Sequence, residues 1–174
     1  MGIQFETDYN METLTAMAKG LRKTVRKKRS RRVHIFAAVV LILGLLTILA
    51  TTAGGEPLGA SGVVTLLAML VVILVSLFED KLNAWFARKR LLPGTEHAVA
   101  TFEEDGYVSA TGVTESRFSY AQIVAVAETA RYFVFALSSH HTQAYDKRTI
   151  RGGSVEDFRA FIAEKTGKLV EKIK

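Results

Sequence analysis

Two long runs of apolar residues constrain this chain more than any other feature of its sequence. Residues 33–53, VHIFAAVVLILGLLTILATTA, and residues 61–78, SGVVTLLAMLVVILVSLF, contain no Asp, Glu, Lys or Arg. As helices they would span about 31 Å and about 27 Å, against a hydrocarbon core of about 30 Å. Helices that are apolar all round need lipid or a large protein core around them, and a chain of 174 residues cannot supply that core. We therefore predict two transmembrane helices.

The segments that flank these two runs differ in charge. Between them lies GGEPLGA, residues 54–60, with one acidic residue and no basic residue. Basic residues gather on the outer flanks, at Arg22, Lys23, Arg26, Lys27, Lys28, Arg29, Arg31 and Arg32 before the first run and at Lys81, Arg88, Lys89 and Arg90 after the second. Lys and Arg concentrate on the cytoplasmic side of membranes, and so short a connection requires antiparallel neighbours. We predict a multi-pass hairpin in the inner membrane with both termini cytoplasmic.

Charge is unevenly distributed along the chain. The formal net charge is +6, and residues 1–32 carry 9 Lys or Arg against 3 Asp or Glu, whereas residues 91–174 carry 10 against 11. A nucleic-acid-binding domain would be basic over its own surface, so we expect no nucleic-acid partner. The chain has no cysteine, which excludes disulfides, cysteine-ligated metals and a cysteine nucleophile.

Residues 1–32 are expected to form an amphipathic, basic N-terminal helix. Residues 7–29 repeat apolar side chains at spacings of three and four, with Thr7 or Asp8 as the N-cap. The apolar stripe could lie in the membrane interface, pack on the C-terminal domain or pack on a second protomer. Basic side chains near a membrane attract anionic headgroups. The candidates for this lipid contact, including two bases of the C-terminal domain, are Arg22, Lys23, Arg26, Lys27, Lys28, Arg29, Lys147 and Arg148.

Residues 91–174 change to a β pattern. Pro93-Gly94 ends the helical part, and Asp105-Gly106 is a strong hairpin signal because it supplies the positive φ of such turns. Alternation of apolar and polar residues predicts one antiparallel meander of about six strands, at residues 98–103, 107–111, 117–120, 122–129, 132–138 and 143–147. At the turn before residue 132 we expect a hydrogen bond from Arg131 to Glu128.

A last helix follows the strands. Gly152-Gly153 interrupts the β pattern, and Ser154 with Asp157 three residues later resembles a capping box. The apolar face of this helix is Val155, Phe158, Phe161 and Ile162, and Gly167 is placed to end it. A curved meander closed by one helix is typical of a small barrel of the pleckstrin-homology-like type.

The predicted fold class is therefore an α+β membrane protein with three parts. Residues 1–32 form the basic N-terminal helix, and residues 33–90 form the transmembrane hairpin, with spans at 33–53 and 61–78 and a juxtamembrane extension. Residues 91–174 form a cytosolic pleckstrin-homology-like antiparallel β-barrel closed by a C-terminal helix.

The motifs around these elements resemble a known family. Two hydrophobic segments and a short loop are followed by FEEDGYVSATG, FSYAQIVAVAETARYFVFALS, YDKR and EDFRAFI, and Phe5 with Thr7-Asp8-Tyr9 precedes them. This order is similar to that of the YcxB-like bacterial membrane proteins. The resemblance implies a bacterial inner-membrane location and a pleckstrin-homology-like cytosolic domain of unassigned activity. Asp146-Lys147-Arg148 stands where that family usually has Pro-Lys-Arg.

Sequence motifs for catalysis are missing. Gly152-Gly153 has no GK[ST] or GxGxxG context, so no phosphate-binding loop is indicated. His140-His141 lies in a predicted turn without an HxH or HExxH partner, which disfavours a metal site. Ser138, Ser139, His140 and Asp146 lack a positioning turn such as GxSxG. We expect no enzyme activity and no cofactor.

These observations favour a binding role. We expect a membrane-anchored cytosolic recognition or scaffolding module that has an anionic-lipid contact and a protein partner or a second copy. The alternative is a structural or accessory subunit of a larger membrane complex. Small residues that would serve that second role by letting helices approach closely are Gly44, Ala50, Ala53, Ser61, Gly62 and Ala68.

Overall fold

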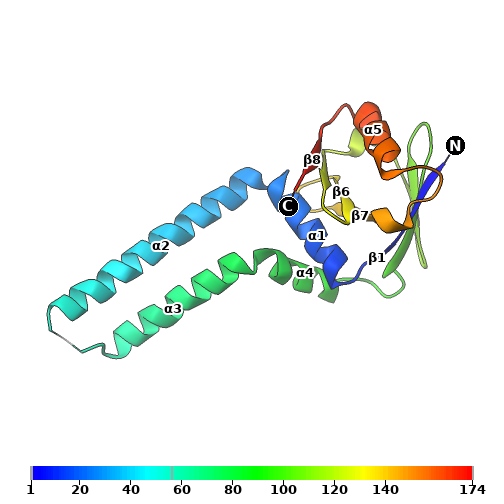
Figure 1. Ribbon diagram of the computed structural model, residues 1–174. Coiled ribbons are helices and arrows are strands. Elements are labelled where there is room, and N and C mark those ends of the chain that lie inside the picture. Colours follow the sequence, from blue (N-terminus) through cyan, green and yellow to red (C-terminus); the bar gives the residue numbers. More distant parts are fainter. Residues whose placement is uncertain (1, 56, 174) are drawn as a thin grey trace. The chain divides into compact units, whose positions relative to one another are not determined.

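A computed structural model describes residues 2–55 and 57–173 of the chain (Figure 1). It is a mixed α+β protein that divides into two compact units. One unit, the α/β unit, contains the residues up to Lys27 and those from Asn83 onward. The other, the helical unit, contains residues 28–82. Each is described separately below.

The first strand of the α/β unit comes from the start of the chain. Strand β1, Ile3–Asp8, pairs antiparallel with β2, His97–Phe102, over its whole length, from Ile3 opposite Phe102 to Asp8 opposite His97. Everything from residue 9 to residue 96 is therefore an insertion in the β1–β2 connection. The prediction of one helix over residues 7–29 was wrong at both ends. Phe5 and Thr7 are buried in this strand, whose pairing partner so far along the chain leaves no local signal, and the helix ends at Lys23 before a new one begins at Lys27.

The strands form two sheets. One has the order β1-β2-β3-β4, where β3 is Tyr107–Thr111 and β4 is Glu115–Phe118. The other has the order β7-β6-β5-β8. Its strands are β5, Ala125–Glu128; β6, Tyr132–Ala136; β7, Thr142–Asp146; and β8, Val170–Lys172, which runs parallel to β5.

The predicted single meander and closed barrel do not occur in the part of the chain that the structure describes. Residues 122–129 do not form one strand. The 3-10 helix η1, Tyr120–Gln122, precedes β5 and carries the chain from the first sheet to the second. The Ser119 and Gln122 side chains close a capping box there. Two strands lie outside the predicted set, because β1 precedes the helices and β8 follows the last one.

Aromatic side chains fill the space between the two sheets. Phe5, Phe102, Phe133 and Phe158 are at most 1% exposed, and their rings pack edge to face at centroid distances of 4.6 to 6.4 Å. Phe158 belongs to α5, Val155–Thr166, which covers this core. The predicted capping box of Ser154 and Asp157 and the predicted end at Gly167, in the left-handed conformation, are both confirmed.

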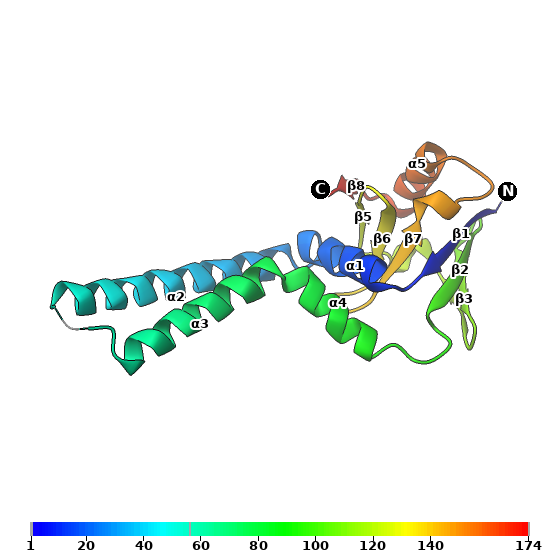
Figure 2. The same ribbon diagram turned by 60° about the horizontal axis from the view of Figure 1, so that its bottom comes forward.

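Helix α1, Met11–Lys23, packs on the second sheet (Figure 2). The Asn10 side chain accepts hydrogen bonds from the backbone of Glu12 and Thr13 and so caps the helix. Leu14 and Leu21 are buried, and Gly20 approaches β6 so closely that a Cβ there would lie 2.7 Å from a Val134 methyl. Of the three predicted environments for the apolar stripe, packing on the C-terminal domain is the one found.

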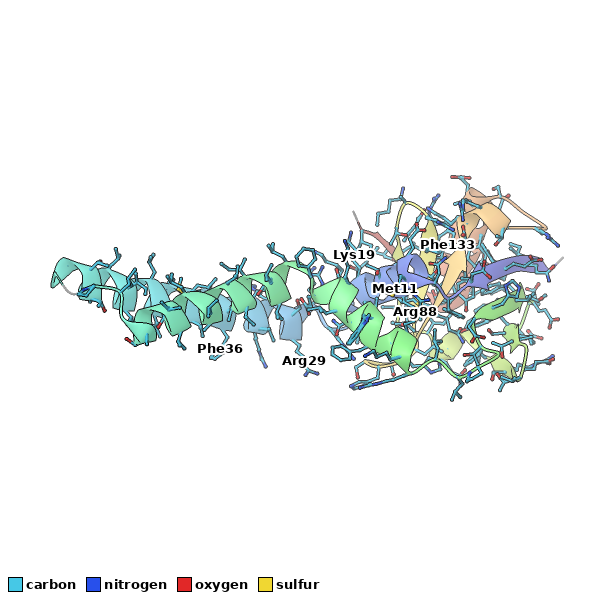
Figure 3. All side chains as sticks on the ribbon, turned by 90° about the horizontal axis from the view of Figure 1, so that it is seen from below. Met11, Lys19, Arg29, Phe36, Arg88 and Phe133 are labelled. Atoms are coloured by element: carbon cyan, nitrogen blue, oxygen red, sulfur yellow. The ribbon has the colours of Figure 1, made fainter. Side chains whose placement is uncertain are left out.

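The helical unit consists of two long apolar helices that run side by side in opposite directions (Figure 1). These are α2, Lys27–Ala53, and α3, Ala60–Leu77, and α4, Glu79–Lys89, follows them. Both α2 and α3 are long and apolar enough to cross a membrane. Most of their large side chains are exposed; Phe36 and Leu77, for example, are 70% and 73% exposed. A stripe on each helix, which includes Leu41 and Met69, is half-buried. Figure 3 shows Phe36 projecting away from α2.

Glycine brings the two helices together at one point. A Cβ on Gly44 would lie 2.8 Å from the Met69 sulfur, and Thr65 lies next to it. Nearer the ends of the pair, His34 Nε2 lies 3.8 Å from Glu79 Oε2. Gly44, predicted as a contact for another helix, is therefore occupied by this chain's own α3.

Candidate functional site

The predicted basic residues differ in what surrounds them. In the α/β unit Lys23 and Lys27 are exposed, whereas Arg22 and Arg26 are half-buried. Arg26 Nε donates a hydrogen bond to the Ser139 carbonyl oxygen at 2.6 Å. In the helical unit Lys28 and Arg29 are exposed and begin α2, and Figure 3 shows Arg29 directed away from the helix. The exposed members are the ones that a headgroup could reach.

Lys147 and Arg148 belong to a different environment. Lys147 Nζ donates to Glu128 Oε1 at 3.0 Å and to the Thr129 carbonyl at 2.7 Å, and its side chain is 13% exposed. Arg148 is exposed but pairs with Asp146 through Nε and Nη2. Lys147 acts as the partner of a buried carboxylate, which leaves Arg148 as the more accessible of the two.

Two buried carboxylates tie the α/β unit together. Arg159 of α5 forms a bidentate pair with Glu128, at 2.7 and 2.8 Å, and with Lys147 this lowers the pKa of Glu128 to about 2. The second carboxylate, Asp146, accepts hydrogen bonds from Arg131 Nε and Nη2. The predicted bond from Arg131 to Glu128 was therefore wrong. Arg131 pairs instead with Asp146 and with Glu12 of α1.

The strongest candidate for a ligand site is a groove of about 340 Å³ in the α/β unit. One wall is formed by β3, β4 and the turn between them, with Ser109, Thr111, Thr114, Ser116 and Phe118. The opposite wall consists of Tyr9 and the α1 side chains Leu14 and Met17, and the remaining lining is Leu91, Thr95, His141, Thr142 and Gln143. The volume lies in the range of small-molecule sites, roughly 300 to 1,000 Å³.

Small side chains on one face of the first sheet explain why the groove exists. Tyr107, Ser109 and Thr111 alternate along β3 and so point to the same face. Tyr107 is paired with Phe118 of β4 and stacks on its ring, whereas Ser109 is paired with Ser116. The face thus changes from aromatic rings at one end to hydroxyls at the other. Where the hydroxyls lie, too few atoms are present to fill the space up to α1.

Gln143 provides a buried polar group at the groove. The residue is 7% exposed, and its Oε1 accepts hydrogen bonds from the hydroxyls of Tyr107 and Tyr145, at 2.8 and 2.7 Å. Among the residues that the structure describes, no hydrogen-bond partner is found for Nε2 of Gln143. Since Gln143 lines the groove, its amide is available to a molecule bound there.

Three hydroxyls accompany this amide. Ser109, Ser116 and Thr142 line the groove; Ser109 and Thr142 are half-buried and Ser116 is exposed, and the described part of the chain contains no hydrogen bond to their hydroxyl groups. Hydroxyls in a partly open hollow are free to bind water or a ligand. Unpaired groups from three strands that meet in one hollow are typical of a binding site rather than of a finished core.

The groove has few acid–base groups: among its described lining residues His141, in an exposed turn, is the one histidine. None of the described residues that line it is Asp, Glu, Lys or Arg. Burial raises the pKa of Tyr9 to about 12, which a backbone hydrogen bond from Ala144 only partly offsets. Burial also raises the pKa of Tyr107 and of Tyr145. These hydroxyls remain neutral hydrogen-bonding groups at physiological pH.

Other chemistry is not assembled in the described residues. Residues 2–55 and 57–173 contain no group of three His, Asp or Glu side chains that could hold a metal ion. Ser139 Oγ lies 2.7 Å from His140 Nδ1 in an exposed turn, but Asp146 is paired with arginines and does not orient that imidazole.

Sequence reasoning missed the groove. The pattern Tyr107, Ser109, Thr111 on one face of a predicted strand was the available signal, because large residues are expected where a strand faces a core. The contribution of α1 could not have been found in this way, since it depends on β1 pairing with β2.

Comparison with known proteins gives one match. Residues 102–162 match the family model described as YcxB-like protein, whereas no curated protein and no solved structure matches the chain. The matched segment contains β3 to β7 and two thirds of α5, together with Glu128, Asp146 and Gln143. Residues 102–162 are therefore similar to the YcxB-like family, as the sequence resemblance predicted.

Proposed function

We propose that this chain is a membrane-anchored recognition protein whose α2 and α3 cross a bacterial inner membrane as a hairpin. The observation that carries the proposal is the pairing of β1 with β2 on either side of two exposed apolar helices. Strands that are hydrogen-bonded to each other lie on the same side of a membrane. The inserted segment must therefore cross an even number of times, which agrees with two spans.

Polar groups within the two helices support a lipid environment. In the hydrocarbon core each polar group has to find its partner inside the protein. The hydroxyls of Thr47, Thr51, Thr65 and Ser76 each donate to the carbonyl one turn earlier, at 2.8 to 2.9 Å. Residues 33–53 and 61–78 have no Asp, Glu, Lys or Arg, which disfavours an ion or proton pathway through one copy.

The orientation follows from charge. Basic residues flank both outer ends of the hairpin and none lies in the connection at residues 54–60. By the positive-inside rule both termini and the α/β unit are cytoplasmic. The two sheets and the covering helix α5 further support a pleckstrin-homology-like arrangement of that unit.

The recognition role rests on the groove, which has unpaired polar groups and no acid–base pair. We infer binding rather than catalysis, without a cofactor. A weak site held beside the membrane gains effective concentration toward anything that is also confined there. A protein partner or a second copy remains part of this proposal.

Contact with anionic lipid is assigned to the exposed bases next to α2, namely Lys23, Lys27, Lys28 and Arg29. Each contributes about 1 kcal/mol when near an anionic surface, and salt screens the attraction over about 8 Å. The apolar stripe of α1 packs on the sheet, so this contact is electrostatic. Changing these four residues to Gln should reduce binding of the detergent-purified chain to anionic liposomes at low salt, and equal binding would reject the contact.

A reporter experiment tests the membrane topology. A reporter active only outside the cytoplasm is fused after Lys174 and, in a second chain, inserted beside Pro57. Signal is expected at Pro57 alone. Signal at Lys174 would overturn the orientation, and signal at neither position in a chain recovered from the soluble fraction would overturn the hairpin.

The alternative function, an accessory subunit of a larger membrane complex, needs a helix face that is open to other helices. Gly44 no longer qualifies, since Met69 covers it. Ala50, Ala53 and Ala68 remain on the helices. Purification in mild detergent distinguishes the two functions, because a subunit would bring a partner at fixed stoichiometry.

A further inference from the structure

We propose that the groove between α1 and the β3–β4 face binds an uncharged sugar ring or a cyclic polyol of the same size. The inference rests on the proposed recognition function and names the ligand class of that site. It is independent of the membrane topology, because every residue that lines the groove belongs to the α/β unit.

Charge is the first argument. A pleckstrin-homology-like domain beside a membrane suggests an anionic headgroup, and a phosphate needs Lys, Arg or a cluster of backbone N–H donors. The described lining of the groove has no Lys or Arg and no carboxylate. A charged ligand would lose part of its hydration there, and among the described lining residues the exposed His141 ring is the one side chain that could offer an anion a positive charge. The ligand is therefore neutral.

Hydrogen-bonding capacity is the second argument. The unpaired groups are the hydroxyls of Ser109, Ser116 and Thr142 and the Nε2 amide of Gln143. A hydroxyl both donates and accepts, so a row of hydroxyls is best matched by ligand hydroxyls, which also do both. The side chains of Ser109 and Ser116 lie directly opposite each other on neighbouring strands, so two adjacent ligand hydroxyls can be bound together.

The position of these groups argues against an extended peptide. Peptides that add to a sheet bind the backbone N–H and C=O groups of an edge strand. Here the free groups are side chains on the face of β3 and β4, and β3 is an inner strand of its sheet. A peptide added at the edge would leave Ser109 and Gln143 unused.

The opposite wall fits the remaining surface of a sugar. Leu14 and Met17 of α1 face the groove, and the Phe118 ring lies at its other side. A pyranose has apolar C–H faces as well as hydroxyls at its rim. A site with hydroxyls on one side and apolar side chains on the other can bury both kinds of surface at once.

Direct binding to the intact chain in lipid nanodiscs tests the proposal. Maltoside and glucoside detergents are avoided because their headgroups are sugars. Three probes share one ring: methyl glucoside is neutral, methyl glucuronide carries a carboxylate and methyl glucosaminide carries an ammonium. Binding is followed by NMR through the side-chain amide resonances of Gln143. Methyl glucoside should shift them saturably with a dissociation constant of about 1 mM, as expected for a ligand of its size.

Substitutions connect the binding to the groove. Ser109→Ala removes one hydroxyl and should weaken methyl glucoside about three- to tenfold. Ser109→Val also fills the space and should abolish binding. Thr101→Val is the matched control, since Thr101 lies on the opposite face of the same sheet, and it should bind as the wild type does. Near-ultraviolet circular dichroism checks that each variant keeps its aromatic packing.

A second arm separates a free sugar from a lipid-borne one. Nanodiscs that contain a glucosyl diacylglycerol are compared with nanodiscs that receive methyl glucoside in solution, and a shift of the Gln143 resonances in either supports the site. The proposal is overturned if neither neutral probe shifts them, if the charged probes bind as well as methyl glucoside, or if both Ser109 variants bind normally. None of these results would change the outcome of the reporter experiment on membrane topology. The sugar-binding proposal and the proposed membrane topology can therefore be rejected independently of each other.

Discussion

The two units of this chain use the same apolar residue types against different surroundings. In the α/β unit Phe133 is fully buried, whereas Phe36 in the helical unit is 70% exposed, and Figure 3 shows the two side chains in these settings. The α/β unit builds its own apolar interior and covers it. The helical unit places its apolar surface outward, where the proposed membrane would cover it at low cost. The exposure of hydrophobic side chains therefore indicates whether a segment is suited to water or to an apolar environment.

The largest expected contrast comes from removing one ring in each unit. Phe158→Ala leaves a cavity among packed aromatic rings and should cost about 3 to 5 kcal/mol of unfolding free energy. Phe36→Ala removes a ring that touches no packed interior, so lipid fills the space and the loss should be much smaller. Thermal unfolding in nanodiscs compares the two variants. An equal loss in both would show that Phe36 is buried by another protein surface.

A charge placed on an exposed leucine sharpens the same comparison. Leu46 in α2 is 56% exposed and Leu169 in the α/β unit is 88% exposed. Leu46→Arg should oppose membrane insertion by about 2.5 to 3.5 kcal/mol, whereas Leu169→Arg should have little effect because water already surrounds that residue. Membrane fractionation and an insertion reporter give the measurement. Normal insertion of Leu46→Arg would contradict a transmembrane α2.

Low pH should destabilise the α/β unit by protonating Glu128. Its pKa of about 2 lies below the ordinary value of 4.5. The stabilisation that ionised Glu128 gives to the folded state is therefore complete above pH 4.5 and is lost as pH falls toward 2. The shift corresponds to roughly 3 kcal/mol. Unfolding free energy measured from pH 6 to pH 2 should decrease over this window. Glu128→Gln should be destabilised already at pH 6 and show a flatter profile, whereas the exposed Glu156→Gln should keep the wild-type slope.

The smallest predicted effect tests how α1 begins. Asn10→Ala removes the hydrogen bonds to the backbone of Glu12 and Thr13 and should cost about 1 kcal/mol. Asn10→Asp keeps the acceptor and should be close to neutral. Denaturant midpoints of the two variants provide the test. Equal stability of Asn10→Ala and the wild type would mean that packing on β6 alone holds the helix.

Elements set by neighbouring residues were predicted well from the sequence. The hairpin at Asp105-Gly106, the bounds of β3, the capping box of Ser154 with Asp157 and the end of α5 at Gly167 all occur where expected. Each depends on interactions within about four residues. Gly106 does not have the predicted positive φ; the turn needs glycine because a Cβ there would lie 2.5 Å from the Phe118 carbonyl oxygen. Predictions were wrong where a local sequence pattern was compatible with two different structures. Residues 7–29 have helical periodicity, but β2 draws Thr7 and Asp8 into a strand, so α1 begins only after Asn10.

The partners of the buried charges could not be predicted. Arg131 and Glu128 are close in the sequence, yet each pairs with residues from other elements, because burial strongly favours the pairing with the best geometry. The groove could not be predicted for the same reason. It needs the hydroxyl face of β3 and β4, the buried amide of Gln143 and the apolar wall of α1 at the same place, and these segments lie far apart along the chain.

By itself the sequence determined two apolar helices of membrane-spanning length, a one-sided distribution of charge and the local starts and ends of most strands and helices. These properties follow from composition, periodicity and short-range hydrogen bonding, which a linear reading contains. The tertiary structure decided that β1 closes the first sheet across the helical insertion, that β8 returns parallel to β5 and that α1 covers the second sheet. Such contacts depend on burial between segments distant in the chain, so only the folded molecule selects among the pairings that the sequence allows.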